Sequence, residues 1–426
     1  MSTFTDSRRP ALDQLLEDSS FYTNPYPVFS RLRDEAPVYW HQASRTWLVA
    51  RYDDVDFVLH SPQLFSNYGF QNAYFENLLP ELRAAAPTLE LRGRSPSLLT
   101  SDPPAHTRLR RLLHSVFSPK AIEELRPRVQ TLVQRLLDDA DNADKNDEVI
   151  DCVATLAHPL PAMLIADIMG VPREDHRVFK KVSGDLLDFM NRPNPNAELT
   201  VEFAREADNS LASLRDYLRG IMADRRRHPR NDVISILSQA DFDGDRLTEE
   251  ELLSNLVLFL IAGHEMTTSL IANGILLFAR HPDQLQAIRV QRELVNPAIE
   301  EIMRFESPVQ RQRRIVAQDL ELGGATLRRG QQLEVLLGSA NRDHKRWENP
   351  DRFDIRRKPV PHIAFGKGIH FCIGAQLARL EAQVVFNDQL NRFSGFEVPT
   401  GREPSWMANT NLRKPDALPV RVRREA

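Results

Sequence analysis

The sequence predicts a mainly helical protein with small β-sheets, organised as one large domain around a long central helix. Helical periodicity dominates about 107–308, whereas strand-like alternation is confined to about 36–60 and 309–340. The chain shows no strand–helix–strand alternation of the kind that favours a Rossmann or barrel fold. No internal repeat or low-complexity linker divides the 426 residues, so we expect a single domain over 1–426.

Composition and charge exclude several classes of protein. The chain is 42% hydrophobic and 27% charged, which is ordinary for a globular protein with a large core. A net charge of −4 gives no electrostatic reason to expect nucleic acid or an anionic membrane as a partner. The only two cysteines, Cys152 and Cys372, are too few for a disulfide framework or a four-thiolate zinc site.

The distribution of apolar residues predicts a cytoplasmic protein. The N-terminus is polar and charged, without the apolar core of a signal peptide. The longest apolar run, Leu256 to Gly263, is far shorter than the about 18 residues that a membrane span requires.

The first strand signal along the chain is Arg45 to Val49. It is followed by Tyr52-Asp53-Asp54, which we interpret as a turn. This segment predicts half of a small sheet within 36–60.

The longest predicted helix begins at a capping box formed by Thr248 and Glu251 and runs to about Arg280. Some thirty helical residues span roughly 45 Å, enough to cross a whole domain. The middle of this segment, Leu256 to Ile261, is apolar on every face, which indicates a buried helix.

Two residues in the middle of this helix oppose its burial. Gly263 has a poor helix propensity, and the Glu265 carboxylate is costly to remove from water. Local rules that are broken together at one place usually mark a functional site.

The C-terminal part of the chain returns to strands and then to a helix. Strand patterns cover Leu320 to Leu322 and Leu333 to Leu337, and helical periodicity covers Ile373 to Phe393.

The sharpest chemical signal is the loop 365–374, Phe-Gly-Lys-Gly-Ile-His-Phe-Cys-Ile-Gly. Three of the chain's 17 glycines fall in this loop, and glycines let a backbone approach a flat ligand closely. Cys372 lies just before a helix, where the exposed amides favour its thiolate form. Such a thiolate is suited to ligate a large planar cofactor.

Other interpretations of these segments fail at single positions. A cysteine-phosphatase loop requires arginine where Ala378 stands, and a zinc-protease motif requires histidine where Thr268 stands. Phe371 replaces the third glycine of a dinucleotide loop, and the glycine of 241–245 is misplaced for an EF-hand. A buried, structural Cys372 remains the simplest alternative.

The loop resembles the haem-binding signature of the cytochrome P-450 superfamily at Phe365, Gly368, Cys372 and Gly374. Four further segments resemble family motifs in matching order: Ala262–Thr268 of the oxygen-activating helix, Glu301–Arg304, Asn349–Phe353, and Asp102–Arg111 of the haem-propionate helix. The resemblance runs from Asn24 to Val420, and it implies the cytochrome P-450 fold.

The resemblance assigns roles to individual residues. Cys372 is the implied axial ligand of haem b, and Glu301, Arg304 and Arg352 are the implied salt-bridged triad that braces the cysteine loop. The implied propionate ligands are His106, Arg110, Arg314 and His370, and the further implied haem contacts are Phe365, Gly366, Gly368, Gly374, Ala262 and Gly263.

The central helix departs from the family pattern at Met266, where a threonine usually follows the acid and helps to deliver protons. A thioether is only a weak acceptor and relays no proton. Three interpretations stay open: water or a substrate hydroxyl replaces the threonine beside Glu265 and Thr267, the enzyme uses peroxide or catalyses a reaction other than hydroxylation, or the residue is engineered.

Periodicity and position predict the substrate pocket. In an extended strand Gln310, Gln312 and Arg314 share one face, so we expect the glutamines to face the substrate while Arg311 and Arg313 point away. The other expected pocket residues are Leu98, Leu99, Leu258, Ile261, Asn411 and Leu412.

The implied activity is insertion of one oxygen atom into a small organic molecule, with a non-catalytic haem sensor as the alternative. All residues are used by one haem domain, so we expect electrons to come from a separate ferredoxin and ferredoxin reductase. We also expect a monomer. We expect a basic patch for this partner at Arg108, Arg110, Arg111, Lys367 and Arg379.

Overall fold

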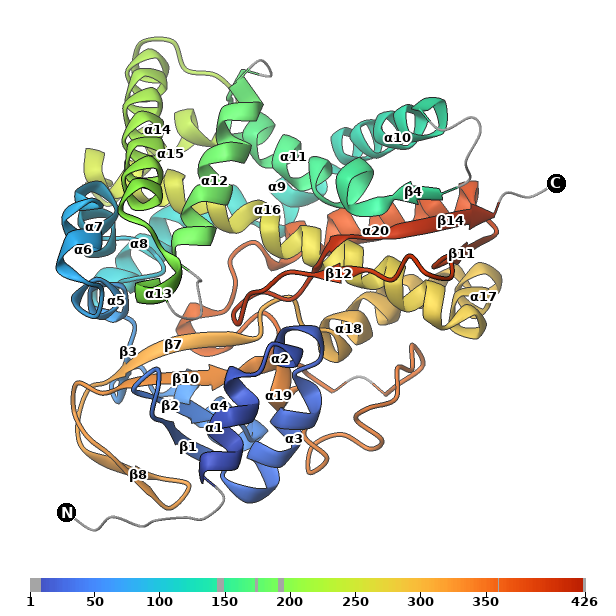
Figure 1. The fold of residues 1–426 in the computed structure, drawn as a ribbon. Coiled ribbons are helices and arrows are strands. Elements are labelled where there is room, and N and C mark those ends of the chain that lie inside the picture. Colours follow the sequence, from blue (N-terminus) through green and yellow to red (C-terminus); the bar gives the residue numbers. More distant parts are fainter. Residues whose placement is uncertain (1–8, 144–148, 173–174, 191–194, 359, 424–426) are drawn as a thin grey trace.

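The computed structural model describes residues 9–143, 149–172, 175–190, 195–358 and 360–423. Helices make up most of this part of the chain, and small sheets lie beside them (Figure 1). The predicted fold class, mainly helical with small sheets and one long central helix, is therefore confirmed.

The N-terminal half is helical apart from short strands. Its helices are α1 (Arg9–Glu17), α2 (Ser20–Thr23), α3 (Tyr26–Glu35), α4 (Tyr52–His60), α5 (Phe70–Glu76), α6 (Pro80–Ala84), α7 (Pro87–Arg94), α8 (Ala105–Leu113), α9 (Pro119–Glu123), α10 (Arg126–Ala143), α11 (Pro159–Met169), α12 (His176–Met190), α13 (Pro195–Glu198) and α14 (Val201–Arg227). Its strands are β1 (Val38–His41), β2 (Thr46–Val49), β3 (Phe65–Ser66) and β4 (Val149–Asp151).

The C-terminal half carries the central helix and most strands. Its helices are α15 (Val233–Gln239), α16 (Glu249–Arg280), α17 (Pro282–Val290), α18 (Val295–Phe305), α19 (Leu337–Ala340) and α20 (Ala375–Arg392). Its strands are β5 (Asp241–Phe242), β6 (Asp245–Arg246), β7 (Arg311–Val316), β8 (Leu320–Leu322), β9 (Ala325–Leu327), β10 (Gln332–Leu336), β11 (Gly395–Glu397), β12 (Ser405–Trp406), β13 (Pro415–Ala417) and β14 (Pro419–Arg423).

The helix α16 crosses the molecule (Figure 1), and the predicted capping box of Thr248 and Glu251 starts it. By length and composition α16 is the one helix of the described residues that could cross a membrane. However, 78% of its most apolar window is buried by the rest of the fold, as in the core helix of a globular domain.

The largest sheet joins segments that are far apart in sequence. Its strand order is β1-β2-β10-β7-β3, with β10 parallel to β2 and antiparallel to β7. An apolar cluster packs between this sheet and α4, and a larger cluster fills the space among the long helices. The pairing with β10 holds β7 in place, and β7 is the strand that lines the site described below.

The prediction for 36–60 was only half right, because Tyr52–His60 forms the helix α4. Asp53 and Asp54, which we interpreted as turn residues, lie in the first helical turn, where carboxylates interact favourably with the helix dipole. Arg51 precedes them in an extended conformation, as the residue before a helix commonly does.

Close packing of α16 against α20 predicts that Gly274→Ala destabilises the protein. An added Cβ would lie 2.4 Å from Phe386 Cζ and 3.0 Å from Ile302 Cδ1, so the helices must separate. We expect the free energy of unfolding to fall by about 1–3 kcal/mol, measured by urea denaturation. Gly220→Ala in α14 is the matched control, because its Cβ would meet nothing within 4 Å. Equal stability of the two variants would contradict the close packing.

Candidate functional site

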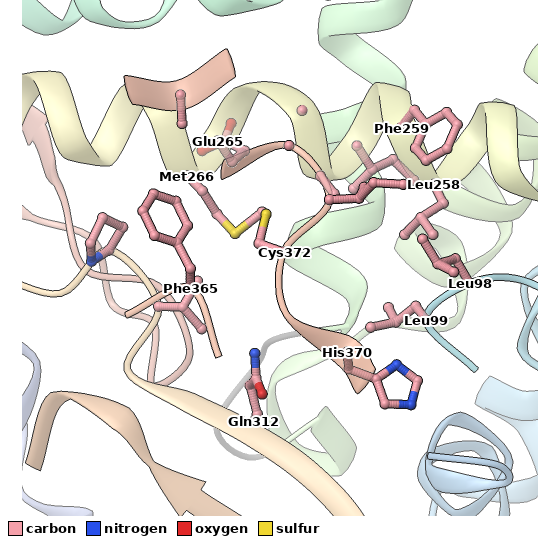
Figure 2. Close-up of a pocket in the computed structure, with 18 of the residues that line it drawn as sticks. Leu98, Leu99, Leu258, Phe259, Glu265, Met266, Gln312, Phe365, His370 and Cys372 are labelled. Carbon is pink, nitrogen blue, oxygen red and sulfur yellow. The ribbon is translucent and has the colours of Figure 1, made fainter. Parts of the chain in front are cut away.

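A cavity of about 380 Å³ lies between α16 and the loop that carries Cys372. Figure 2 shows Leu258, Phe259, Glu265 and Met266 on α16, with Cys372 in the loop near them. The walls are mainly apolar, and they come from α5, α7, α12, α16, β7 and the C-terminal segment. The residues expected in the substrate pocket that line it are Leu98, Leu99, Leu258, Ile261, Gln312, Asn411 and Leu412.

Backbone geometry sets the position of Cys372. Its N–H donates to the carbonyl of Phe365 at 3.0 Å, and α20 begins three residues later at Ala375. Gly366 and Gly368 both have positive φ, and a Cβ on Gly368 would lie 2.2 Å from the carbonyl oxygen of Leu59. The loop therefore requires glycine at that position for conformation and for space.

The protein alone favours the neutral thiol of Cys372. Burial raises its pKa, while the N–H of Gly374 and the cations Arg110 and Arg379 act in the opposite direction with smaller effect. In the protein alone, burial therefore affects this thiol more than the Gly374 N–H and the two cations do. A coordinated metal ion is what deprotonates such a thiol.

A cluster of four basic side chains, His106, Arg110, Arg314 and His370, lies beside this loop. The rings of the two histidines are 4.2 Å apart, and Arg110 donates to the carbonyl of Phe371 at 2.8 Å. Within the described chain, neither nitrogen of His106 nor Nε2 of His370 has a hydrogen-bond partner. Burial lowers the pKa of His106 to about 4 and that of Arg314 to about 10.

The basic cluster and Cys372 together fit a haem. No carboxylate forms a salt bridge with Arg110 or Arg314 among the residues that the structure describes, so these buried and half-buried donors suit the propionates of the cofactor. Across the described parts of the chain, no three or more His, Cys, Asp or Glu side chains are grouped so that they could hold a metal ion. A single thiolate suits an iron whose in-plane ligands belong to a macrocycle.

The position of the loop depends on the buried ion pair of Glu301 and Arg304. Arg304 donates from Nε and Nη2 to the two carboxylate oxygens of Glu301 at 2.7 and 2.8 Å. The third member is Arg357, whose Nε lies 3.3 Å from Glu301, and not Arg352 as the sequence suggested. The side chain of Arg352 is exposed, and only its carbonyl turns inward to accept from Arg304.

The Glu265 carboxylate is held by two basic groups. Lys414 Nζ lies 2.7 Å from Oε2, and His264 Nε2 lies 3.2 Å from Oε1, with all three side chains buried. Burial raises the pKa of Glu265, but contacts with His264 and Lys414 together outweigh it and hold this pKa well below its usual range. Nothing in the sequence indicated Lys414, because it lies far from α16 along the chain.

Two neighbours of Glu265, Met266 and Thr267, line the cavity. Ala262 and Gly263 line the cavity on the same helix, and Gly263 packs so closely on Ile165 that a Cβ would lie 2.9 Å from its Cγ1. The close approach of α11 to α16 therefore explains the glycine in this buried helix.

The prediction for Gln310 was wrong. Its Nε2 donates to the carbonyl of Ser307 at 2.7 Å, and its side chain packs against Gly338 instead of lining the cavity. The reason is that β7 begins only at Arg311, so strand alternation does not extend to Gln310. The prediction that Arg311 and Arg313 point away was only partly right: each pairs with Glu334 at 3.0 Å, but both residues also line the cavity.

The expected basic patch is largely neutralised by acids. Arg108 and Arg111 pair with Asp245, Lys367 pairs with Asp56, and Arg379 pairs with Glu300. Its attraction for an acidic partner is therefore weaker than the number of cations suggested.

Comparisons with known proteins agree with this site. A family model described as Cytochrome P450 matches residues 46–418. The chain is 37% identical to the cytochrome P450 monooxygenase PikC of Streptomyces venezuelae, over 99% of this chain and 96% of that protein. It is 34% identical to the polyketide biosynthesis cytochrome P450 PksS of Bacillus subtilis, over 94% and 96%. The solved structure of CYP109E1 from Bacillus megaterium with corticosterone has a TM-score of 0.80 and 34% identity, covering 94% of this chain and 98% of that chain.

The ion-pair geometry predicts that Arg357→Leu and Arg352→Leu differ. Loss of the charged hydrogen bonds of Arg357 lowers the free energy of unfolding by about 2 kcal/mol and reduces the haem bound per protein. Arg352→Leu keeps the inward-turned carbonyl, so both quantities stay near those of the wild type. Urea denaturation and haem absorbance measure the two effects. A larger loss for Arg352→Leu would contradict the assignment.

The contacts of Glu265 predict a pH-dependent effect of Lys414→Met. Because the folded-state pKa of Glu265 is lowered, its ion pair stabilises the fold fully above the unfolded-state pKa and is lost as pH falls through the folded-state pKa. Lys414→Met should therefore cost about 3 kcal/mol at neutral pH, and the deficit should shrink in acid. Adding Glu265→Gln should restore most of the stability; a double variant as unstable as Lys414→Met would contradict the pairing.

Proposed function

The chain belongs to the cytochrome P450 family, and from this premise we propose that it hydroxylates or epoxidises a small organic molecule of secondary metabolism. It is a cytochrome P450 monooxygenase and carries a haem. The observation that supports our proposal for the substrate is the mainly apolar cavity, which places substrate-sized space next to Cys372 and Glu265. Among the relatives, PksS is named for polyketide biosynthesis, which is consistent with a secondary metabolite.

The haem is proposed to be haem b, held by Cys372 and by the basic cluster of His106, Arg110, Arg314 and His370. When bound, it supplies the iron that activates dioxygen, and the thiolate's electron donation favours O–O cleavage. The two guanidinium groups would supply positive charge for the propionates, and the neutral histidines would supply N–H donors.

Glu265 is proposed to organise water within the cavity. Its lowered pKa keeps the carboxylate ionised at neutral pH, so it accepts hydrogen bonds and orients water instead of donating its own proton. Met266 offers no hydroxyl at the adjacent position, and Thr267 is the next hydroxyl on the cavity wall. Ordered water beside Glu265 is therefore proposed to replace the hydroxyl that Met266 lacks.

The electrons are proposed to come from a separate ferredoxin and its reductase in the cytoplasm. We propose that all of residues 1–426 serve a single, monomeric haem domain. Phe371, which precedes the cysteine, is 40% exposed and offers an apolar contact for the partner on this side of the loop.

A peroxide-driven reaction is the second candidate function, and Met266 is the observation that favours it. Without a hydroxyl beside Glu265, the chain has one group fewer for delivering protons to reduced oxygen. Preformed hydrogen peroxide already carries those protons.

Reconstituted turnover tests the proposed function. The holoenzyme, a ferredoxin, its reductase and NADPH are incubated with candidate metabolites under isotopically labelled dioxygen. We expect one labelled oxygen atom in the product, detected by mass spectrometry. Product formed only with hydrogen peroxide would favour the second candidate. Binding without product under either condition would contradict both and favour a sensor.

The absence of a hydroxyl at Met266 predicts that Met266→Thr improves coupling. We expect a larger fraction of NADPH consumption to yield product and a smaller fraction to yield hydrogen peroxide, measured in the same assay. Met266→Val is the matched control, because valine has nearly the shape of threonine but no hydroxyl. Equal coupling in the two variants would contradict a role of the threonine hydroxyl in proton transfer.

A further inference from the structure

A cationic side chain, Arg92, lines the cavity away from the cysteine loop, on the helix α7. This helix packs against α14 and α5. At the adjacent Gly93, an added Cβ would lie 3.3 Å from Cβ of Gln71, so α7 approaches α5 closely. Packing between helices therefore fixes the backbone at Arg92, and the residue lines the cavity.

The carboxylates near Arg92 have other partners, and the buried Asp208 of α14 accepts from the backbone N–H of Leu89 at 2.8 Å. On α7 itself, Glu90 accepts from Arg83 at 2.6 Å and from Arg94 at 2.5 Å. On the neighbouring α16, Glu250 accepts from Arg215 at 2.7 Å. In the described parts of the chain no salt bridge or side-chain hydrogen bond involves Arg92.

The surroundings of Arg92 leave its positive charge uncompensated. Burial lowers its pKa to about 10, and the nearby cation Arg215 lowers it further, with no acid acting in the opposite direction. The side chain is nevertheless protonated at neutral pH. The cavity as a whole is mainly apolar, with Phe70, Leu186 and Met190 among its lining residues. A half-buried cation without a protein partner in such a cavity is stabilised by a ligand of opposite charge.

We propose that Arg92 binds the carboxylate of an otherwise apolar substrate. A planar guanidinium matches a carboxylate through two parallel hydrogen bonds, and one cation balances one negative charge. The apolar remainder of the cavity suits the hydrocarbon part of such an acid. The inference rests on the proposed function and adds the substrate class, an apolar carboxylic acid.

Ligand titrations of the ferric holoenzyme, followed by the change in haem absorbance, test this inference without turnover. The probes are dodecanoate with methyl dodecanoate and dodecanol, and phenylpropanoate with its methyl ester and alcohol. We expect at least one acid to bind about tenfold or more tightly than its two neutral analogues. Arg92→Gln should remove this preference by weakening only the acid, and Arg92→Lys should retain part of it.

Arg94→Gln is the matched control, because Arg94 lies on the same helix but is exposed and paired with Glu90. It should leave every dissociation constant unchanged. Failure of both acids to bind, equal binding of acids and neutral analogues, or equal weakening of both by Arg92→Gln would overturn the inference. Acid binding through Arg92 without any turnover would contradict the proposed function alone, and turnover of neutral substrates without acid binding would contradict this inference alone.

Discussion

The ion pair of Arg304 and Glu301 connects the helical part of the molecule to the long connection that ends at Cys372. Besides its carboxylate partner, Arg304 donates to the carbonyls of Asn341 and Pro350 at 2.9 Å each, and Glu301 accepts from the N–H of Asp354 at 3.0 Å. Both charges are buried, so each requires the other to compensate for the loss of water. The pair therefore holds the connection at several points along its length, and the cysteine loop begins from a fixed position.

The parts of the fold and site that the sequence predicted are those governed by local rules. The capping box at Thr248 and the apolar run after it specify α16 without reference to the rest of the chain. The glycines around Cys372 are equally local signals, because positive φ is a property of single residues. Gly263 was identified as a break in a helix, although its cause, contact with Ile165, appears only in the folded molecule.

The parts that escaped prediction depend on contacts between distant segments. Lys414 reaches Glu265 across about 150 positions, and no spacing rule relates two such residues. Arg357 replaces Arg352 because the connection turns one side chain outward and the other toward Glu301. The prediction for Gln310 was wrong for a related reason, because the alternation of side chains predicts a face only inside a strand. The position of each of these side chains is set by tertiary structure, which the local sequence pattern does not contain.

The central claim is that the Cys372 thiolate binds the haem iron. The most direct test is the carbon monoxide difference spectrum of the reduced protein, compared among the wild type, Cys372→Ser and Cys152→Ser. Cys152 is the matched control, because it is the other free cysteine and lies buried in the core. We expect the spectrum of thiolate-ligated haem in the wild type and in Cys152→Ser, and its loss in Cys372→Ser. A thiolate spectrum that persists in Cys372→Ser would contradict the assignment.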